Sequence, residues 1–312
     1  VSGLINTTGA GKRIKTGRAA NIFGRTTYEP TLDPFKIQTE SAMPNTLPKS
    51  LINIYACCLV IVAFATPIKP AIAQDADVPS IRAVADIHYL PSKIAFGSCS
   101  NQNKPQPILD TVVTQKPDLF IYLGDNIYGD TKDMDILAQK YQKLGSKQEF
   151  QKLRANTTVL STWDDHDYGW NDAGKEYQFK EASKEIFMNF WSVPNDSSRR
   201  KRAGIYGSHT FSDGKNTLQV ILLDTRTFRD PLKRNSETNN LDGKFKNAYQ
   251  PDATKKTILG DAQWKWLENE FKQNADLRII CSSIQFGHEY NGWESWTNLP
   301  NEQKKMAELI KK

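Results

Sequence analysis

The sequence predicts an α/β fold built from layers of strands and helices. Short, almost wholly apolar runs, of the kind that form strands buried on both faces, alternate along the chain with segments of helical spacing. Polar residues that can bind metals follow several of these runs directly. Because reactive side chains in such folds lie just past the carboxyl ends of the strands, the same pattern also predicts a site.

The elements follow one another in a regular order from residue 93 onward. One helix is closed by Gly145, and Asp213-Gly214 marks a tight turn between two adjacent strands. The predicted strands are KIAFGSC (93–99), PDLFIYLGDN (117–126), TTVLSTWDD (157–165), GIYGSHTFSDG (204–214), TLQVILLDTR (217–226) and DLRIICSSIQ (276–285). The predicted helices are QPILDTVVTQ (106–115), TKDMDILAQKYQKLG (131–145), KEYQFKEASKEIFMNFW (175–191), GDAQWKWLENEFKQN (260–274) and PNEQKKMAELIKK (300–312).

The region before this alternation reads as a leader and a targeting segment. Lys49 precedes an apolar run of secretory length, and Ala71-Ile72-Ala73 supplies a cleavage motif, which together indicate a signal peptide. The alternative is an uncleaved membrane anchor. The predicted organisation is a disordered or non-native leader (1–42), a signal peptide (43–73), a linker (74–92) and one folded domain (93–312). Cleavage near Ala73 would place the protein in the periplasm or outside the cell, through the secretion machinery.

The net charge of +6 suggests an anionic partner, but the excess is concentrated near the amino terminus. Residues 1–73 hold eight Lys and Arg against three acids, and the remainder carries 33 basic and 32 acidic residues, a balance of +1. A strongly basic domain is the footprint of nucleic-acid binding. Because the part of the chain beyond residue 73 is nearly balanced in charge, no nucleic-acid partner is predicted. Only two cysteines, Cys99 and Cys281, lie beyond the apolar run, which is too few for a disulfide framework.

The strand ends bring together side chains that bind metals. Cys99 ends the first predicted strand, Asp125 and Asn126 the second, and Asp164-Asp165-His166-Asp167 the third. Thiolate, carboxylate, imidazole and phenolate groups are all metal ligands. We therefore expect Cys99, Asp125, Tyr128, Asp165 and His166 to form one rim that could hold two cations.

Two cations about 3.5–4 Å apart clamp a phosphate ester and turn a bridging water into hydroxide. In this interpretation Asp125 bridges the metals and the hydroxide attacks phosphorus in line. His166 stabilises the transition state or protonates the leaving oxygen, and Arg226 binds phosphate oxygens bidentately.

Six segments of the chain, in order, resemble the alkaline phosphatase D (PhoD-like) metallophosphatases. They are FGSC, YLGDNIYGD, WDDHDYGWND, LDTR, LGDAQWKWL and SSIQ…GWESW. The resemblance runs from about residue 93 to the end of the chain. It implies a calcineurin-like α/β sandwich with two packed mixed sheets flanked by helices. It also implies hydrolysis of phosphomonoesters and phosphodiesters by an exported enzyme.

The same resemblance implies the metals and the roles of individual residues. A ferric ion would be bound by Cys99, Asp125 and Tyr128, and calcium or another divalent ion would fill the remaining positions, with Asp165 as a further ligand. His166 and Arg226 would be catalytic, and Asn126 and Arg226 would contact the substrate. Asn126 departs from the Tyr that often follows this Asp in the family, which leaves the preference between monoesters and diesters open.

Several alternatives stay open at the level of the sequence. Asp164 is either a helix cap or a ligand, and Arg226 has Asp224 and Asp230 as nearby ion-pair partners. Asp165-His166-Asp167 is a D-x-D pattern, like that of phosphatases that form an aspartyl-phosphate on one Mg²⁺. The last alternative is a secreted phosphate-binding protein without activity.

The carboxyl-terminal residues give one more expectation. The resemblance implies late ligands, usually in a Gly-Asp-x-His strand, but no His or Asp follows Trp296. The sequence therefore predicts a chain that is truncated at its carboxyl terminus and whose second metal lacks ligands.

Overall fold

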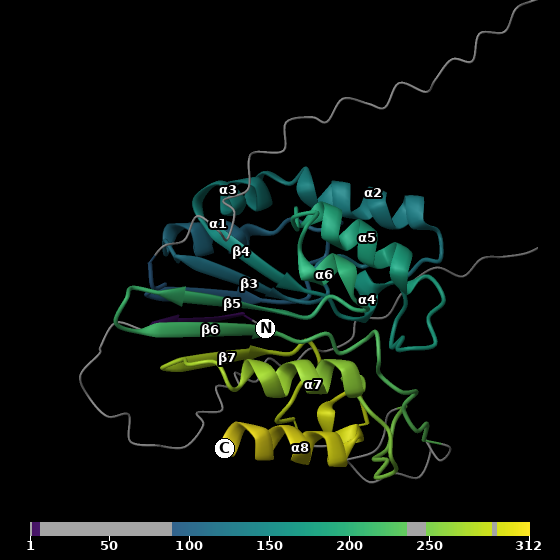
Figure 1. Cartoon of the computed structure of the whole chain (residues 1–312). Helices are drawn as coiled ribbons and strands as arrows, with labels where there is room; N and C mark the ends of the chain where they lie inside the picture. The colour runs from purple at the N-terminus through teal and green to yellow at the C-terminus, as the bar shows by residue number, and fades with distance from the viewer. Residues whose placement is uncertain (1, 7–88, 236–247, 289–291) are drawn as a thin grey trace, which may run out of the picture. The chain divides into compact units, whose positions relative to one another are not determined.

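In a computed structural model of the whole chain, the structure describes residues 2–6, 89–235, 248–288 and 292–312. The chain divides into two units, of which Gly11–Gln74 is one. That unit lies outside the described residues, and so do the predicted leader beyond residue 6, the signal peptide and most of the linker. The other unit contains every described element (Figure 1). None of the helices in the described part has the length and apolarity needed to cross a membrane.

Two sheets form the centre of this unit. The first has the order β1-β2-β3-β4, in which β2, β3 and β4 run parallel and β1 pairs antiparallel with β2. The second has the order β5-β6-β7, with an antiparallel β5–β6 pair and a parallel β6–β7 pair. The strands are β1 Ser2–Asn6, β2 Lys93–Gly97, β3 Leu119–Leu123, β4 Thr158–Thr162, β5 Gly207–Ser212, β6 Thr217–Leu222 and β7 Leu277–Cys281. β1 falls in the segment that the sequence analysis left out of the fold.

Alternation of side chains along the strands gives both sheets two buried faces. On β3, Leu119 and Ile121 pack against the second sheet, whereas Phe120 and Tyr122 pack against helices. On β6, Val220 faces the first sheet and Ile221 faces the opposite helices. The result is a sandwich of four layers: helices, sheet, sheet, helices. This confirms the predicted class, with two packed mixed sheets flanked by helices.

Helices cover the outer face of each sheet. In Figure 1, α1, α2, α3 and α5 lie on one side of the two sheets, and α7 and α8 lie on the other. The helices are α1 Pro107–Thr114, α2 Met134–Gly145, α3 Gln148–Asn156, α4 Asp165–Tyr168, α5 Lys180–Phe190, α6 Ser198–Lys201, α7 Gly260–Glu270 and α8 Pro300–Lys311. The sequence did not predict α3, α4 and α6, which are short and carry few apolar residues at helical spacing. The basic run SSRRKR (197–202) contains α6, with Arg199 buried.

Three hydrogen bonds join the ends of strands from the two sheets. Thr162 Oγ1 donates to the carbonyl oxygen of Leu223 at 2.7 Å, and Trp163 Nε1 donates to Asp224 Oδ1 at 3.0 Å. Ser283, just past β7, donates its hydroxyl to Asp164 Oδ1 at 2.8 Å. The carboxyl ends of β4, β6 and β7 are thereby held at one place, where the predicted site residues lie.

Candidate metal centre

The loops after β2 and β3 lie side by side and carry the first group of site residues. Cys99 donates its backbone N–H to the carbonyl oxygen of Gly124 at 3.2 Å, and its Sγ lies 3.6 Å from Asp125 Oδ2. The buried Gln102 side chain binds both backbone groups of Tyr128, at 2.9 and 3.1 Å. Cys99, Asp125 and Tyr128 are therefore gathered by backbone contacts between two loops.

Two of these ligand candidates, Cys99 and Tyr128, are weaker acids in this surrounding than they ordinarily are. Partial burial and the Asp125 carboxylate raise the pKa of the Cys99 thiol. Burial, followed by the charges of Asp125 and Cys99, raises the pKa of the Tyr128 phenol well above its ordinary value. Cys99 is exposed and Tyr128 is half-buried, so both shifts combine a partial loss of hydration with nearby negative charge, which a cation would offset.

The four polar residues in the turn after β4 do not all point to the site, because one of them points into the interior. Asp167 is fully buried and accepts hydrogen bonds from the backbone N–H groups of Asp125, Asn126 and Asp164 at 3.2, 3.3 and 2.6 Å. It also accepts from Asn126 Nδ2 at 2.5 Å. Asp167 thus ties the β3 loop to the start of α4. Because both of its oxygen atoms are occupied, a nucleophilic attack by Asp167 is not compatible with this geometry.

Asp165 and His166 point to the same place as Asp125. One ligand atom from each of these three residues lies within 4.8 Å of the other two. Burial, together with the charges of Asp164 and Asp165, raises the pKa of Asp125 to about 8. Such crowding of carboxylates is costly in the absence of a cation.

Two buried oxygen atoms at this place have no hydrogen-bond partner among the residues that the structure describes. They are Asp125 Oδ1 and Asn126 Oδ1, and Asn126 is fully buried. The amide nitrogen of Asn126 is held by the carbonyl oxygen of Thr162 at 2.8 Å, so its Oδ1 cannot exchange places with it without losing that bond. Buried acceptors without a donor are rare, and a metal ion would satisfy both. The donor set therefore fits a bound cation.

His166 is oriented by a residue that the sequence analysis did not identify. Its Nδ1 lies 2.7 and 2.8 Å from the two carboxylate oxygens of Asp130. Burial lowers the pKa of His166, but the hydrogen bond to Asp130 and the charges of Asp165 and Asp125 outweigh it and raise the value to about 9. With Nδ1 engaged by Asp130, the other ring nitrogen is the one left for a substrate or a metal.

Arg226 lies behind these acids and is only 1% exposed. Its Nε donates to Asp164 Oδ1 at 2.6 Å, and its two terminal nitrogens bind both oxygens of Glu294 at 2.9 and 2.7 Å. The sequence predicted that Arg226 would hold phosphate oxygens or pair with Asp224 or Asp230. In the structure its side chain holds Asp164 and Glu294, and only its backbone N–H contacts Asp224, at 2.9 Å. Arg226 therefore organises carboxylates and does not face the solvent.

A second group of acids adjoins the first. Asp165, Asp172 and Glu294 also place one ligand atom each within 4.8 Å of the others. Asp172 donates its backbone N–H to Asp165 Oδ2 at 2.7 Å and accepts from the Tyr249 hydroxyl at 2.8 Å. The sequence segments that contain Asp172 and Glu294, WND and GWESW, were noted for their resemblance, but neither residue was given a role. Asp164 is the N-cap residue of α4, which agrees with its reading as a cap.

The backbone at the site adopts an uncommon conformation at several positions. Cys99, Asp125, Asp130 and Asp172 all have positive φ, between 44° and 61°. Such a conformation is uncommon for residues other than glycine and is often found at functional sites. At Gly124, with φ of 105°, a Cβ atom would come within 2.6 Å of the Asp164 Cβ. This glycine therefore permits the β3 and β4 loops to approach each other closely enough to share ligands.

The fold and the site together define a class: an α/β sandwich with a carboxylate-rich, metal-competent centre at the carboxyl ends of its strands. The model of the family described as PhoD-like phosphatase matches residues 94–308. The chain belongs to this family.

A solved structure titled "Structure of PhoD" has the same fold, with a TM-score of 0.55 and 19% sequence identity. The match covers 70% of this chain and 48% of that one, so the chain spans about half the length of that protein. A comparison with curated proteins found no match.

Proposed function

We propose that this protein hydrolyses phosphate esters in a metal-dependent reaction at the centre formed by Asp125, Asp165 and His166. One observation carries the proposal: these residues converge within 4.8 Å, beside two buried oxygens, Asp125 Oδ1 and Asn126 Oδ1, that have no hydrogen-bond partner in the described part of the chain. Bound cations would supply Lewis acidity and a nucleophilic hydroxide at neutral pH. Membership of the PhoD-like phosphatase family supports the same reaction class.

The tasks of the residues in this proposal come from the family resemblance, for the metals, and from the contacts of each side chain. Cys99, Asp125 and Tyr128 would hold a ferric ion, and Asp165 with Asn126 would hold a divalent ion such as calcium. His166, whose Nδ1 is held by Asp130, can donate a proton to the leaving oxygen from its other ring nitrogen. Arg226 keeps Asp164 and Glu294 in place and offsets their charge.

The experiment measures hydrolysis of p-nitrophenyl phosphate and bis-p-nitrophenyl phosphate by the purified protein. The protein is first stripped with a chelator and then supplied with Fe³⁺, Ca²⁺, both or other divalent ions. We expect turnover only after metal is restored. Tight phosphate binding without metal and without turnover would overturn the proposal and favour the alternative of a phosphate-binding protein. A trapped phospho-aspartate would instead favour the aspartyl-phosphate mechanism.

The ferric assignment makes a spectroscopic prediction at Cys99. Thiolate and phenolate ligands of Fe³⁺ give visible charge-transfer bands, so the iron-loaded protein should be coloured, and Cys99→Ser should lose the thiolate contribution to the band and most of the activity. Cys281→Ala is the matched control, because Cys281 is buried in β7 within the core between the sheets. Absorption spectra and bound iron are measured on both variants. An unchanged band in Cys99→Ser would remove Cys99 from the ligand set.

We also propose that the protein is exported after cleavage near Ala73, for the reason that the apolar run and the Ala71-Ile72-Ala73 motif have the order of a signal peptide. Amino-terminal sequencing of the exported protein should then begin near Gln74. A product that still begins at Val1 would contradict cleavage.

A further inference from the structure

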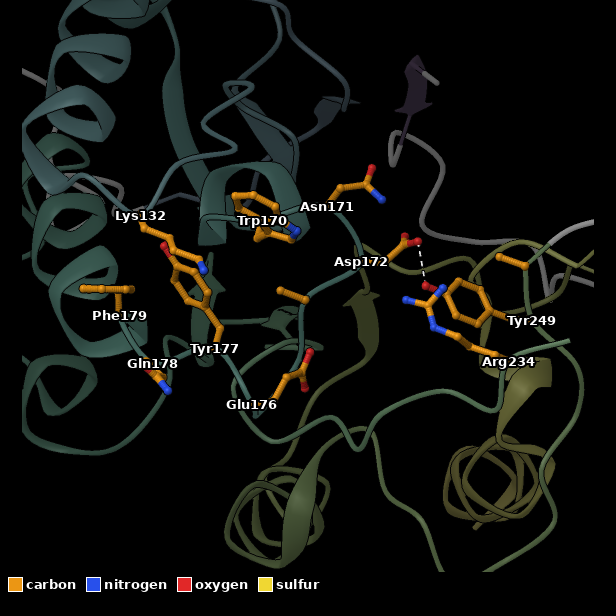
Figure 2. Close-up of a pocket in the computed structure, with 12 residues that line it drawn as sticks. Lys132, Trp170, Asn171, Asp172, Glu176, Tyr177, Gln178, Phe179, Arg234 and Tyr249 are labelled. Carbon is orange, nitrogen blue, oxygen red and sulfur yellow. Dashed lines mark hydrogen bonds between the residues drawn. The ribbon is translucent and has the colours of Figure 1, made fainter. Parts of the chain in front are cut away.

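A cavity of about 650 Å³ opens next to the metal centre (Figure 2). Its volume is within the range of small-molecule sites, which is about 300–1,000 Å³. Asp172 belongs both to the lining of this cavity and to the acidic group around Asp165. A phosphate ester held at the centre would therefore extend the rest of the molecule into the cavity.

Aromatic side chains are prominent in the lining. Figure 2 shows Trp170, Tyr177 and Phe179 on one side of the cavity and Tyr249 on the other. The Trp170 side chain is 48% exposed and that of Phe179 is 37% exposed, although large apolar groups are normally covered. Exposed ring faces at a cavity are suited to stacking on a flat ligand.

Positive charge lies near two of these rings. Lys132 Nζ is 5.5 Å from the Trp170 ring centre, and the Arg234 guanidinium is 5.9 Å from the Tyr249 ring centre. Among the residues that the structure describes, neither cation forms an ion pair with a carboxylate. The two acids of the lining have other partners: Glu176 accepts from the Gly174 N–H at 2.9 Å, and Asp172 accepts from Tyr249. The two cations are thus available for an anionic ligand.

The polar side chains that line the cavity limit the chemical classes of ligand that it can bind. Asn171, Gln178 and Glu176 line the cavity, and an acyl chain would leave their hydrogen-bonding groups without partners. A small alcohol would leave the exposed rings uncovered. A planar heterocycle satisfies both, because its faces stack on aromatic side chains and its edge forms hydrogen bonds.

We propose that this cavity binds the nucleoside part of a nucleotide, so that the phosphate esters used at the metal centre are nucleotide esters. The reaction rests on the proposed function, whereas binding in the cavity can be measured without it. The nucleoside stacks on Trp170, and the positive charges of Lys132 and Arg234 at the cavity attract the anionic ester.

The test compares binding of thymidine 5′-monophosphate, glycerol 3-phosphate and inorganic phosphate to the protein by isothermal titration calorimetry, with tryptophan fluorescence as a second readout. We expect thymidine 5′-monophosphate to bind about tenfold or more tightly than the other two. Trp170→Ala should lose this advantage, and Trp170→Phe should keep most of it. Tyr89→Ala is the matched control, because Tyr89 is similarly exposed, at 43%, and does not line the cavity.

Equal affinity for thymidine 5′-monophosphate and glycerol 3-phosphate would overturn the inference, and so would an unchanged preference in Trp170→Ala. Hydrolysis of bis-p-nitrophenyl phosphate by the same preparations separates the two proposals. Hydrolysis without any nucleotide preference leaves the proposed function standing and rejects the nucleoside site. A nucleotide preference that depends on Trp170, without hydrolysis under any metal, supports the nucleoside site and rejects the proposed function.

Discussion

Asp125→Ala is expected to abolish metal binding and to reduce phosphate-ester hydrolysis by more than about 100-fold. The reason is that Asp125 lies close to proposed ligands of both metals. Its Oδ2 is 3.6 Å from the Cys99 Sγ, and one of its oxygens is within 4.8 Å of the ligand atoms of Asp165 and His166. Loss of an outer partner of a metal ligand costs about 10- to 100-fold in affinity or activity, so loss of a shared ligand should cost more. Bound metal is measured by elemental analysis, and hydrolysis with bis-p-nitrophenyl phosphate.

The same substitution should not weaken the metal-free protein. Asp125 is 9% exposed and is crowded by other carboxylates, which raise its pKa to about 8 together with burial. Removing it relieves this repulsion, so metal-free Asp125→Ala should unfold at the same temperature as the metal-free parent protein or at a higher one. Asp110→Ala is the matched control, because Asp110 forms only a surface ion pair with Lys152 at 3.0 Å. Unchanged metal content in Asp125→Ala would refute the proposed centre.

Asp167→Asn is expected to lower the free energy of unfolding by about 3 kcal/mol, because it leaves a buried N–H donor without an acceptor and places a second N–H group against it. Its carboxylate accepts from the backbone N–H groups of Asp125, Asn126 and Asp164 and from the Asn126 side chain. An amide would turn an N–H group toward one of these donors. Since the same bonds position Asp125 and Asn126, metal affinity should fall as well. Chemical denaturation and metal titration measure both effects.

Asp118→Asn is the matched control for Asp167→Asn. Asp118 also accepts from backbone N–H groups, those of Ser92 and Lys93, at 2.8 and 3.0 Å, but it uses a single oxygen for them. An amide can keep its oxygen in that place, so the loss of stability should be small. If Asp167→Asn folded as stably as the parent protein but lost turnover alone, Asp167 would have a chemical role, and the aspartyl-phosphate mechanism would gain support.

The sequence alone determined the layered α/β class and the location of the site. The all-buried strands β3 and β4 could be predicted because a run such as LFIYL has no polar face to offer to water. The site could be located because parallel strands end at the same edge, which places Asp125 and Asp165 near each other whatever the details of the loops. Cys281, in the predicted strand 276–285, and Trp264, in the predicted helix 260–274, are both buried.

Only the tertiary structure decided which of the adjacent polar side chains face the site and which are buried in the interior. Asp164, Asp165, His166 and Asp167 are consecutive and look equivalent in the sequence. In a helix each residue is rotated by about 100° from the one before it. Asp165 and His166 therefore meet Asp125, while Asp167 points into the interior. The partner of Arg226 was also beyond prediction, because Glu294 lies 68 residues further along the chain, in the segment that follows β7, which pairs with β6 in the same sheet. Such contacts depend on long-range geometry, which local sequence patterns do not encode.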